Sequence, residues 1–93
     1  MTGLSREQRA RRLLLTTLAM RATLHLGATR FTTLNQLAAP VLTAGQVAIQ
    51  LSAWEDAGLI TSSSSLIDGI PELIYRITDA GQTECDRLRD EQP

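Results

Sequence analysis

The sequence predicts a small α+β domain that is mainly helical and carries one β-hairpin toward its C-terminal end. Its 93 residues suffice for one domain, and its 6 glycines and 3 prolines are too few for a disordered or collagen-like chain. Apolar residues recur at helical spacing in several segments, and two β-prone runs flank turn residues between 59 and 77. A chain of this size buries only about 60–65% of its unfolded surface, so we expect a thin core and a partner subunit.

A long helix is expected over about residues 5–26. Ser5 and Gln8 have the spacing of a capping box, and the first glycine after them is Gly27. One broad face of this helix is apolar and comprises Leu14, Leu15, Leu18, Ala19, Ala22 and Leu26. A second, narrower apolar stripe lies almost opposite and comprises Leu13, Met20 and Leu24. Because a helix with two apolar sides needs two partners, we expect this stripe to contact a second copy of the chain, beside the C-terminal helix at Leu88.

The next segment predicts a short strand followed by a short helix. The run at 30–33 is β-prone. The helix is expected over 34–39, because Pro40 stops it and a preceding threonine, Thr32 or Thr33, can cap it.

A third helix is expected over 44–57, so that a helix-turn-helix covers about residues 33–57. Thr43 is placed to cap this helix, and Gly58 is placed to end it. Its core-facing residues at helical spacing are Val47, Leu51 and Trp54. We expect Trp54 to be largely buried.

A β-hairpin is expected over about residues 59–77. Turn residues gather at 68–71, and we expect a loop longer than two residues, with Ser62–Ser65 as a flexible arm. Thr78 then caps a final helix over about residues 79–90. All these elements form a single domain over 1–93.

The order helix–strand–helix–helix–strand–strand–helix is that of a winged helix-turn-helix, and two stretches resemble the MarR/ArsR/PadR-like winged-helix transcriptional regulators. Residues 42–59, LTAGQVAIQLSAWEDAGL, are similar to the family pattern LT-x-G-x-L-S-x-H-L-x-x-L-E-x-A-G-L. Residues 75–81, YRITDAG, are similar to its pattern Y-R-L-T-x-x-G, and the resemblance covers about residues 13–88. It implies a dimeric DNA-binding transcriptional regulator whose recognition helix enters the major groove of duplex DNA.

Charge is unevenly distributed along the chain, although the net charge is −1. Residues 1–30 hold six arginines and one glutamate, a net charge of +5, whereas residues 31–75 hold four acids and no arginine, a net charge of −4. The recognition helix therefore has no cation where the family carries polar or basic residues, and the wing tip has Asp68 and Glu72. Because phosphate neutralisation supplies much of the affinity for DNA, we expect phosphate contacts from the N-terminal segment.

Candidate DNA contacts follow from this distribution. Phosphate contacts are expected from Arg6, Arg9, Arg12 and Arg30. Base-edge contacts are expected from Gln46, Ile49, Gln50 and Ser52, because glutamine can pair with adenine and isoleucine can contact a thymine methyl. The alternatives are a solvated helix end for the arginines, an ion pair for Arg30, ordinary surface positions for the glutamines, and a protein-binding apolar patch at Ile49.

Two functions remain open from the sequence. The first is a dimeric DNA-binding regulator with an unusually non-basic recognition helix. The second is a winged-helix module for protein–protein interaction that has lost or weakened DNA binding. The two differ in whether the N-terminal arginines share a face with the recognition helix.

Catalytic and metal chemistry find no support in the sequence. His25, the single histidine, falls on the core-facing side of the first helix and is expected to be partly buried. Cys85, the single cysteine, cannot form an internal disulfide and is expected to be a small buried hydrophobe. Neither a nucleophile motif nor a nucleotide-binding glycine motif is present, so we expect no enzyme activity, cofactor or metal. Without an apolar run near ~18 residues or a signal peptide, the sequence predicts a soluble, cytoplasmic protein that makes no membrane contact.

Overall fold

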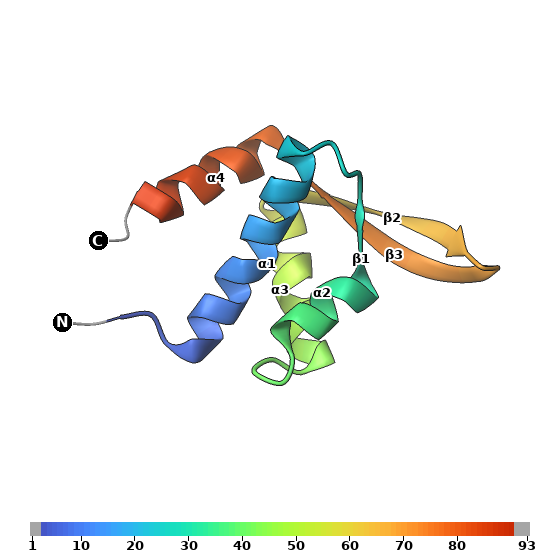
Figure 1. Ribbon diagram of the computed structural model, residues 1–93, viewed down its shortest axis with the longest axis horizontal. Coiled ribbons are helices and arrows are strands. Elements are labelled where there is room, and N and C mark those ends of the chain that lie inside the picture. Colours follow the sequence, from blue (N-terminus) through green and yellow to red (C-terminus); the bar gives the residue numbers. More distant parts are fainter. Residues whose placement is uncertain (1–2, 91–93) are drawn as a thin grey trace.

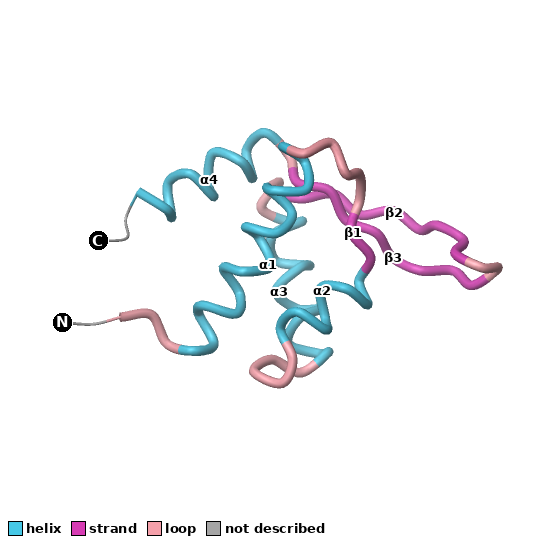
Figure 2. The backbone as a smooth tube through the Cα atoms, viewed as in Figure 1, coloured by secondary structure: helices cyan, strands magenta, loops and turns pink. Residues whose placement is uncertain are grey.

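The computed structural model of the chain describes residues 3–90, which form four helices and three strands (Figure 1). In chain order these are α1 (Arg6–Thr23), β1 (Thr29–Arg30), α2 (Phe31–Ala38), α3 (Ala44–Asp56), β2 (Ile60–Ile67), β3 (Ile70–Ile77) and α4 (Asp79–Asp90). The strands form one antiparallel sheet in the order β1-β3-β2. The helices gather at one end of this sheet, and the β2–β3 hairpin, the wing, projects beyond them (Figure 2).

The core lies where the first three helices meet the base of the sheet. Its buried side chains come from α1 (Leu14, Leu15, Leu18), α2 (Leu34, Ala38), α3 (Val47, Leu51) and the sheet (Ile60, Tyr75). The apolar face expected for the long helix is thus confirmed over its first four turns. Trp54, expected to be largely buried, is only half-buried, because it lies in the last turn of α3 at the rim of the core.

Helix α1 ends earlier than the sequence predicts, at Thr23 rather than near residue 26. His25 adopts a left-handed conformation with φ 56°, its N–H donates to the Ala22 carbonyl, and the Leu26 N–H donates to the Arg21 carbonyl. This is a Schellman C-cap, a motif that usually has glycine at the left-handed position. His25 and Leu26 therefore leave the helical face and are exposed, which corrects the expectation that both face the core.

The boundary between β1 and α2 also differs from the sequence prediction. The strand is only Thr29–Arg30, and Phe31 already begins the helix. Neither of the two threonines expected as cap residues plays that role, and the N-cap residue Arg30 makes no side-chain cap bond. Instead the Glu72 carboxylate, from β3, accepts a hydrogen bond from the Thr32 N–H at 3.3 Å. A partner from the wing thus satisfies an open amide of the α2 N-terminus.

The wing is a regular hairpin whose register runs from Ile60 opposite Ile77 to Ile67 opposite Ile70. Its turn consists of two residues, Asp68 and Gly69, with φ of 52° and 79°. Positive φ at both positions defines a type I′ turn, for which Asp-Gly is a preferred pair. The expected longer loop and flexible serine arm are therefore wrong, because the four serines are part of β2.

Helix α4 returns from the wing and packs against α1. Thr78 caps it as predicted, since the Thr78 Oγ1 accepts from the Gly81 N–H at 3.1 Å and donates to the Leu59 carbonyl at 2.9 Å. The Gln82 side chain donates to the Ala19 carbonyl of α1 at 3.3 Å. None of the helices within residues 3–90 is both long and apolar enough to cross a membrane.

Candidate nucleic-acid interface

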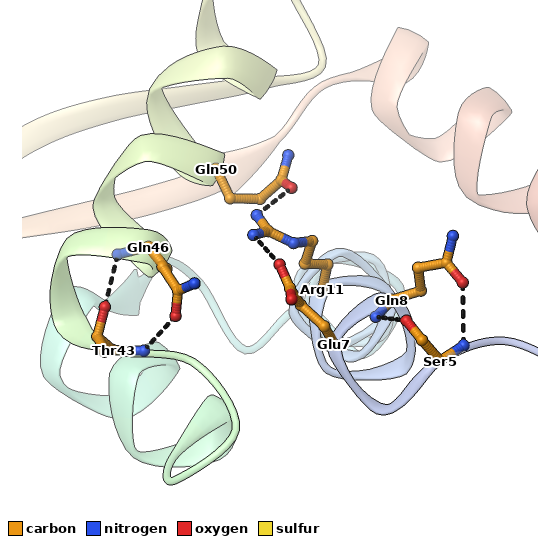
Figure 3. A network of polar contacts seen from close by, with 7 residues as sticks. All are labelled: Ser5, Glu7, Gln8, Arg11, Thr43, Gln46 and Gln50. Atoms are coloured by element: carbon orange, nitrogen blue, oxygen red, sulfur yellow. Dashed lines mark hydrogen bonds and ion pairs between the residues drawn. The ribbon is translucent and has the colours of Figure 1, made fainter.

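Helix α3 is held at its amino end by a capping box (Figure 3). The Gln46 N–H donates to Thr43 Oγ1 at 3.1 Å, and the Thr43 N–H donates to Gln46 Oε1 at 2.9 Å. The side-chain oxygen of Gln46 is therefore engaged, and its amide NH₂ group is left as a donor. Gln46 is half-buried and belongs first to the helix start.

Gln50, one turn further along α3, is also engaged. Its Oε1 accepts a hydrogen bond from the Arg11 guanidinium of α1 at 2.9 Å, and the same guanidinium forms an ion pair with Glu7 at 2.7 Å (Figure 3). The bridge fixes α3 against the first half of α1. Sequence reasoning missed Arg11, because its partner lies 39 residues away; only the i, i+4 spacing of Glu7 and Arg11 was visible in the sequence.

The solvent side of α3 is a neutral strip of small and apolar side chains. Its exposed residues over the first three turns are Ala44, Gly45, Ala48, Ile49, Ser52 and Ala53. Ile49 is 71% exposed, as the sequence predicts. Two acids, Glu55 and Asp56, follow at the carboxyl end of the helix. The strip is one face of the helix, and Ser52 supplies its hydroxyl group.

Three of the predicted phosphate contacts lie on the first two turns of α1. Arg6 and Arg9 are exposed and Arg12 is half-buried, and within residues 3–90 none of the three side chains has a hydrogen bond or an ion pair. Arg9 projects about 160° away from Arg11 around the helix. Arg6 and Arg9 line a groove together with Val41, which belongs to the turn immediately before α3. The same groove is lined by Leu37 and Ala38 of α2. These two arginines therefore lie beside the end of α2 and the turn that leads into α3, and not on the exposed strip of α3.

Arg30, the fourth predicted phosphate contact, is engaged in an ion pair. Its guanidinium contacts Glu72 Oε2 through Nε at 2.9 Å and through Nη2 at 2.8 Å. The hydrogen bonds from Arg30 and then from Thr32 hold the pKa of Glu72 below its ordinary value. Arg30 thus ties the wing to the start of α2.

The wing carries apolar side chains at its tip instead of cations. Leu66 and Ile70 are 71% and 68% exposed, and Leu73 is 48% exposed. Asp68 occupies the turn. The geometry offers no phosphate contact at this tip.

The second apolar stripe of α1 is uncovered within the chain. Leu13, Met20 and Leu24 are 43%, 54% and 58% exposed. Leu88 of α4 is half-buried and packs against the core. The stripe is a contiguous apolar face that no described element covers.

The remaining chemical side chains do not converge. His25 is exposed and lines a cavity of about 340 Å³ together with Tyr75 and Arg76. The Cys85 thiol is half-buried, 4.0 Å from the Thr16 hydroxyl. Within residues 3–90, no three His, Cys, Asp or Glu side chains come together in a way that could hold a metal ion.

No protein-family model matches the sequence, and no curated protein matches it. The fold, in contrast, has clear structural neighbours. It is similar to Bacillus subtilis PadR in complex with operator DNA, with a TM-score of 0.60 and 21% sequence identity. That match covers 82% of this chain and 49% of the PadR chain, so this chain spans about half the length of PadR.

A second neighbour is TA0346 from Thermoplasma acidophilum. The TM-score is 0.68 and the sequence identity is 21%, over 87% of this chain and 77% of TA0346. The two likenesses show the fold of this chain and confirm the winged helix-turn-helix class. Neither neighbour is described as an enzyme.

Proposed function

We propose that this chain is a DNA-binding transcriptional regulator that lays the exposed strip of α3 into the major groove of duplex DNA. The observation that carries the proposal is the winged-helix scaffold it shares with PadR, which was solved in complex with operator DNA. On this scaffold α3 is capped, is fixed to α1 through Arg11 and Gln50, packs Val47 and Leu51 into the core, and exposes its strip to solvent. A rigid, exposed helix is what major-groove recognition requires.

The phosphate contacts in this proposal come from α1. The side chains of Arg6 and Arg9 have no hydrogen bond or ion pair within residues 3–90, and they lie beside the turn that leads from α2 into α3. Arg12 is the third contact. Arg30 serves in the wing anchor instead, since its ion pair with Glu72 occupies the guanidinium. Affinity that comes from phosphate contacts is independent of the DNA sequence and decreases steeply as the salt concentration rises.

Base recognition in this proposal is mainly apolar. Ile49 and the neighbouring alanines contact thymine methyl groups, and Ser52 and the free NH₂ groups of Gln46 and Gln50 supply polar contacts. One chain alone makes few contacts with DNA, and a second copy of the chain adds affinity through a second half-site. We therefore include in the proposal a homodimer formed through Leu13, Met20 and Leu24, beside Leu88 of α4, because this face is apolar and uncovered in one chain.

The test is fluorescence anisotropy of a labelled duplex titrated with wild-type protein and with variants, over a range of salt concentrations. Replacing Arg6 and Arg9 by Ala removes two phosphate contacts. The slope of log affinity against log salt should fall by about two units, while the ranking of DNA sequences is preserved. The matched control is Arg89→Ala, which removes an exposed arginine paired with Asp86 on α4 and should leave the slope unchanged.

Two outcomes contradict this assignment in different ways. Unchanged binding by the double variant means that the cations of α1 do not contact phosphates. No binding by the wild-type protein at low salt removes the DNA function altogether. The winged-helix protein-interaction module then takes its place, with exposed Ile49 as part of the binding surface.

A further inference from the structure

The wing has one long free edge. In the sheet order β1-β3-β2, strand β2 is terminal, and within residues 3–90 no strand pairs with its outer side. The edge is eight residues long, from Ile60 to Ile67, and its register opposite β3 runs without a bulge. The outer half of the hairpin extends past the helices (Figure 2), so the edge is open to solvent there. A strand edge of this length without a bulge is a template for another strand.

Nothing in β2 protects this edge. Natural edge strands are usually blocked by charged residues, prolines or bulges. Strand β2, with the sequence ITSSSSLI, has no charged residue and no proline. The cation of the hairpin, Arg76, lies at its base, opposite Thr61.

The opposite edge of the wing, in contrast, is blocked. There β1 covers β3 at Ile74 and Tyr75. Closer to the tip, Pro71 lacks the N–H that a new strand would need, and Glu72 is held by Arg30. Within the described sheet, β2 is therefore the strand whose outer edge can pair with an added strand.

The register shows which backbone groups of β2 are free. Ile67 and Ile70 flank the two-residue turn and form its hydrogen-bonded pair, and such pairs alternate along an antiparallel ladder. The N–H and C=O groups of Ser62, Ser64 and Leu66 therefore point away from β3. An added strand can bond to all three without disturbing the hairpin.

Apolar side chains accompany these free backbone groups. Leu66 is 71% exposed, and Leu73 is 48% exposed on the same face of the hairpin, since Leu73 lies opposite Ser64. Side chains at alternate positions of an added strand would cover this face. The surface thus offers hydrogen bonds along the edge and apolar contact beside it.

The acidic residues near both ends of the β2 edge favour a basic segment as its binding partner. Exposed acids flank both ends: Glu55 and Asp56 at the base, where Glu55 accepts a hydrogen bond from Ser62 at 2.7 Å, and Asp68 at the tip. A strand with basic residues near its two ends meets opposite charge at both. A second copy of β2 would pair antiparallel and bring its own Asp68 beside Glu55 and Asp56, where like charges repel.

We propose that the free edge of β2 binds an extended segment of a partner protein as an added strand, and that this segment alternates apolar side chains and carries Arg or Lys near both ends. The site is separate from the exposed strip of α3 and does not depend on DNA binding. It uses main-chain hydrogen bonds for affinity and the acidic flanks for selection of the partner.

The probe is a blocked peptide of about nine residues, matching the ~25 Å length of the edge, with the sequence Arg-Val-Thr-Val-Thr-Val-Thr-Val-Arg. It is titrated into the full-length isotope-labelled chain while the amide resonances are followed by NMR. The amides of Ser62, Ser64 and Leu66 should shift and become protected from exchange. A peptide with Glu in place of both Arg residues should bind about tenfold more weakly.

Two controls separate strand addition from charge attraction. A basic peptide with alternate N-methylated amides keeps the charge and loses the edge hydrogen bonds, so it should not bind. The variant Ser64→Pro removes an outward N–H and should abolish binding, whereas Ser64→Ala keeps that N–H and should bind like the wild type. If Ser64→Pro fails to fold, the N-methylated peptide still decides the question.

Several results would overturn the proposal. These are an absence of β2 shifts with the basic peptide, equal binding of the acidic or N-methylated peptides, and shifts of the β2 amides caused by duplex DNA. Concentration-dependent shifts of the same amides without peptide would identify a second copy of the chain as the occupant instead.

Discussion

At the scale of single residues, Gly81 holds a close backbone contact that leaves no room for a side chain. A Cβ atom at this position would overlap the Leu59 carbonyl oxygen and the Ile77 side chain. Gly81 is buried where α4 crosses the start of the wing, next to the hydrogen bonds made by Thr78. The glycine therefore sets how closely α4 approaches the sheet.

Gly81→Ala should destabilise the chain by about 3 kcal/mol, because neither the backbone of Leu59 nor the packed Ile77 can move aside. For a domain of this size, that loss lowers Tm by roughly 10–20 °C. The matched control is Gly45→Ala in α3, where the nearest atom is Thr43 Oγ1 at 3.9 Å. It should be neutral or stabilising by up to about 1 kcal/mol, because alanine favours the helix. Thermal unfolding followed by circular dichroism compares the two; equal Tm values would refute the close approach at Gly81.

At the scale of elements, the boundaries that the sequence predicted well are those with local causes. The capping box at Ser5 and Gln8 and the caps at Thr43 and Thr78 are confirmed, because each involves residues three apart. The two-residue turn at Asp68 and Gly69 also has a local cause, although the sequence prediction missed it. Two other errors have distant or unusual causes. The end of α1 depends on a histidine in a left-handed conformation, and the start of α2 depends on a carboxylate from the wing.

The same distinction applies to the candidate interface. Exposure of Ile49 followed from helical periodicity alone. The hydrogen bond between Arg11 and Gln50 and the ion pair between Arg30 and Glu72 each join residues about forty positions apart. Contacts over such a separation follow no helical or strand spacing, so a single sequence does not reveal them.

The Glu72 anchor between the wing and α2 predicts a defined pH dependence. The pKa of Glu72 is lowered from 4.5 in the folded chain, so its contribution to stability is complete above pH 4.5 and is lost as the pH falls through the lowered pKa. Glu72→Gln should therefore flatten the decline of unfolding free energy below pH 4.5, measured by urea titration at a series of pH values. Glu84→Gln should flatten the decline as well, because the pKa of Glu84 is also lowered, through its hydrogen bond with Arg87; it is a positive comparison at a site away from the wing. If the unfolding free energy of Glu72→Gln fell with decreasing pH as steeply as that of the wild type, Glu72 would not be the anchor between the wing and α2.

At the scale of the whole molecule, the chain has an elongated shape of 49 × 28 × 23 Å, with uncovered apolar faces on α1 and on the wing. The face on α1 is the one that the proposed homodimer uses. Its residues lie along one side of a single long helix, and a second copy can cover them by two-fold symmetry. The wing remains free for other partners in such a dimer.

Wild-type protein should sediment as a dimer at about 100 μM, well above a micromolar dissociation constant. Met20→Glu places a charge in the centre of the stripe and should give a monomer that remains folded, since Met20 is 54% exposed. Ile49→Glu, on α3 and even more exposed to solvent, should stay dimeric. A wild-type monomer at this concentration would end the dimer proposal.

The central claim is that DNA contacts α3 and the arginines of α1, while the wing stays free. Amide shift mapping of the labelled chain with a short duplex at low salt tests it most directly. The account predicts shifts over residues 44–53 and 6–12, with none at the wing tip over 66–70. Shifts confined to the wing or α4, or no shifts at all at low salt, would contradict it.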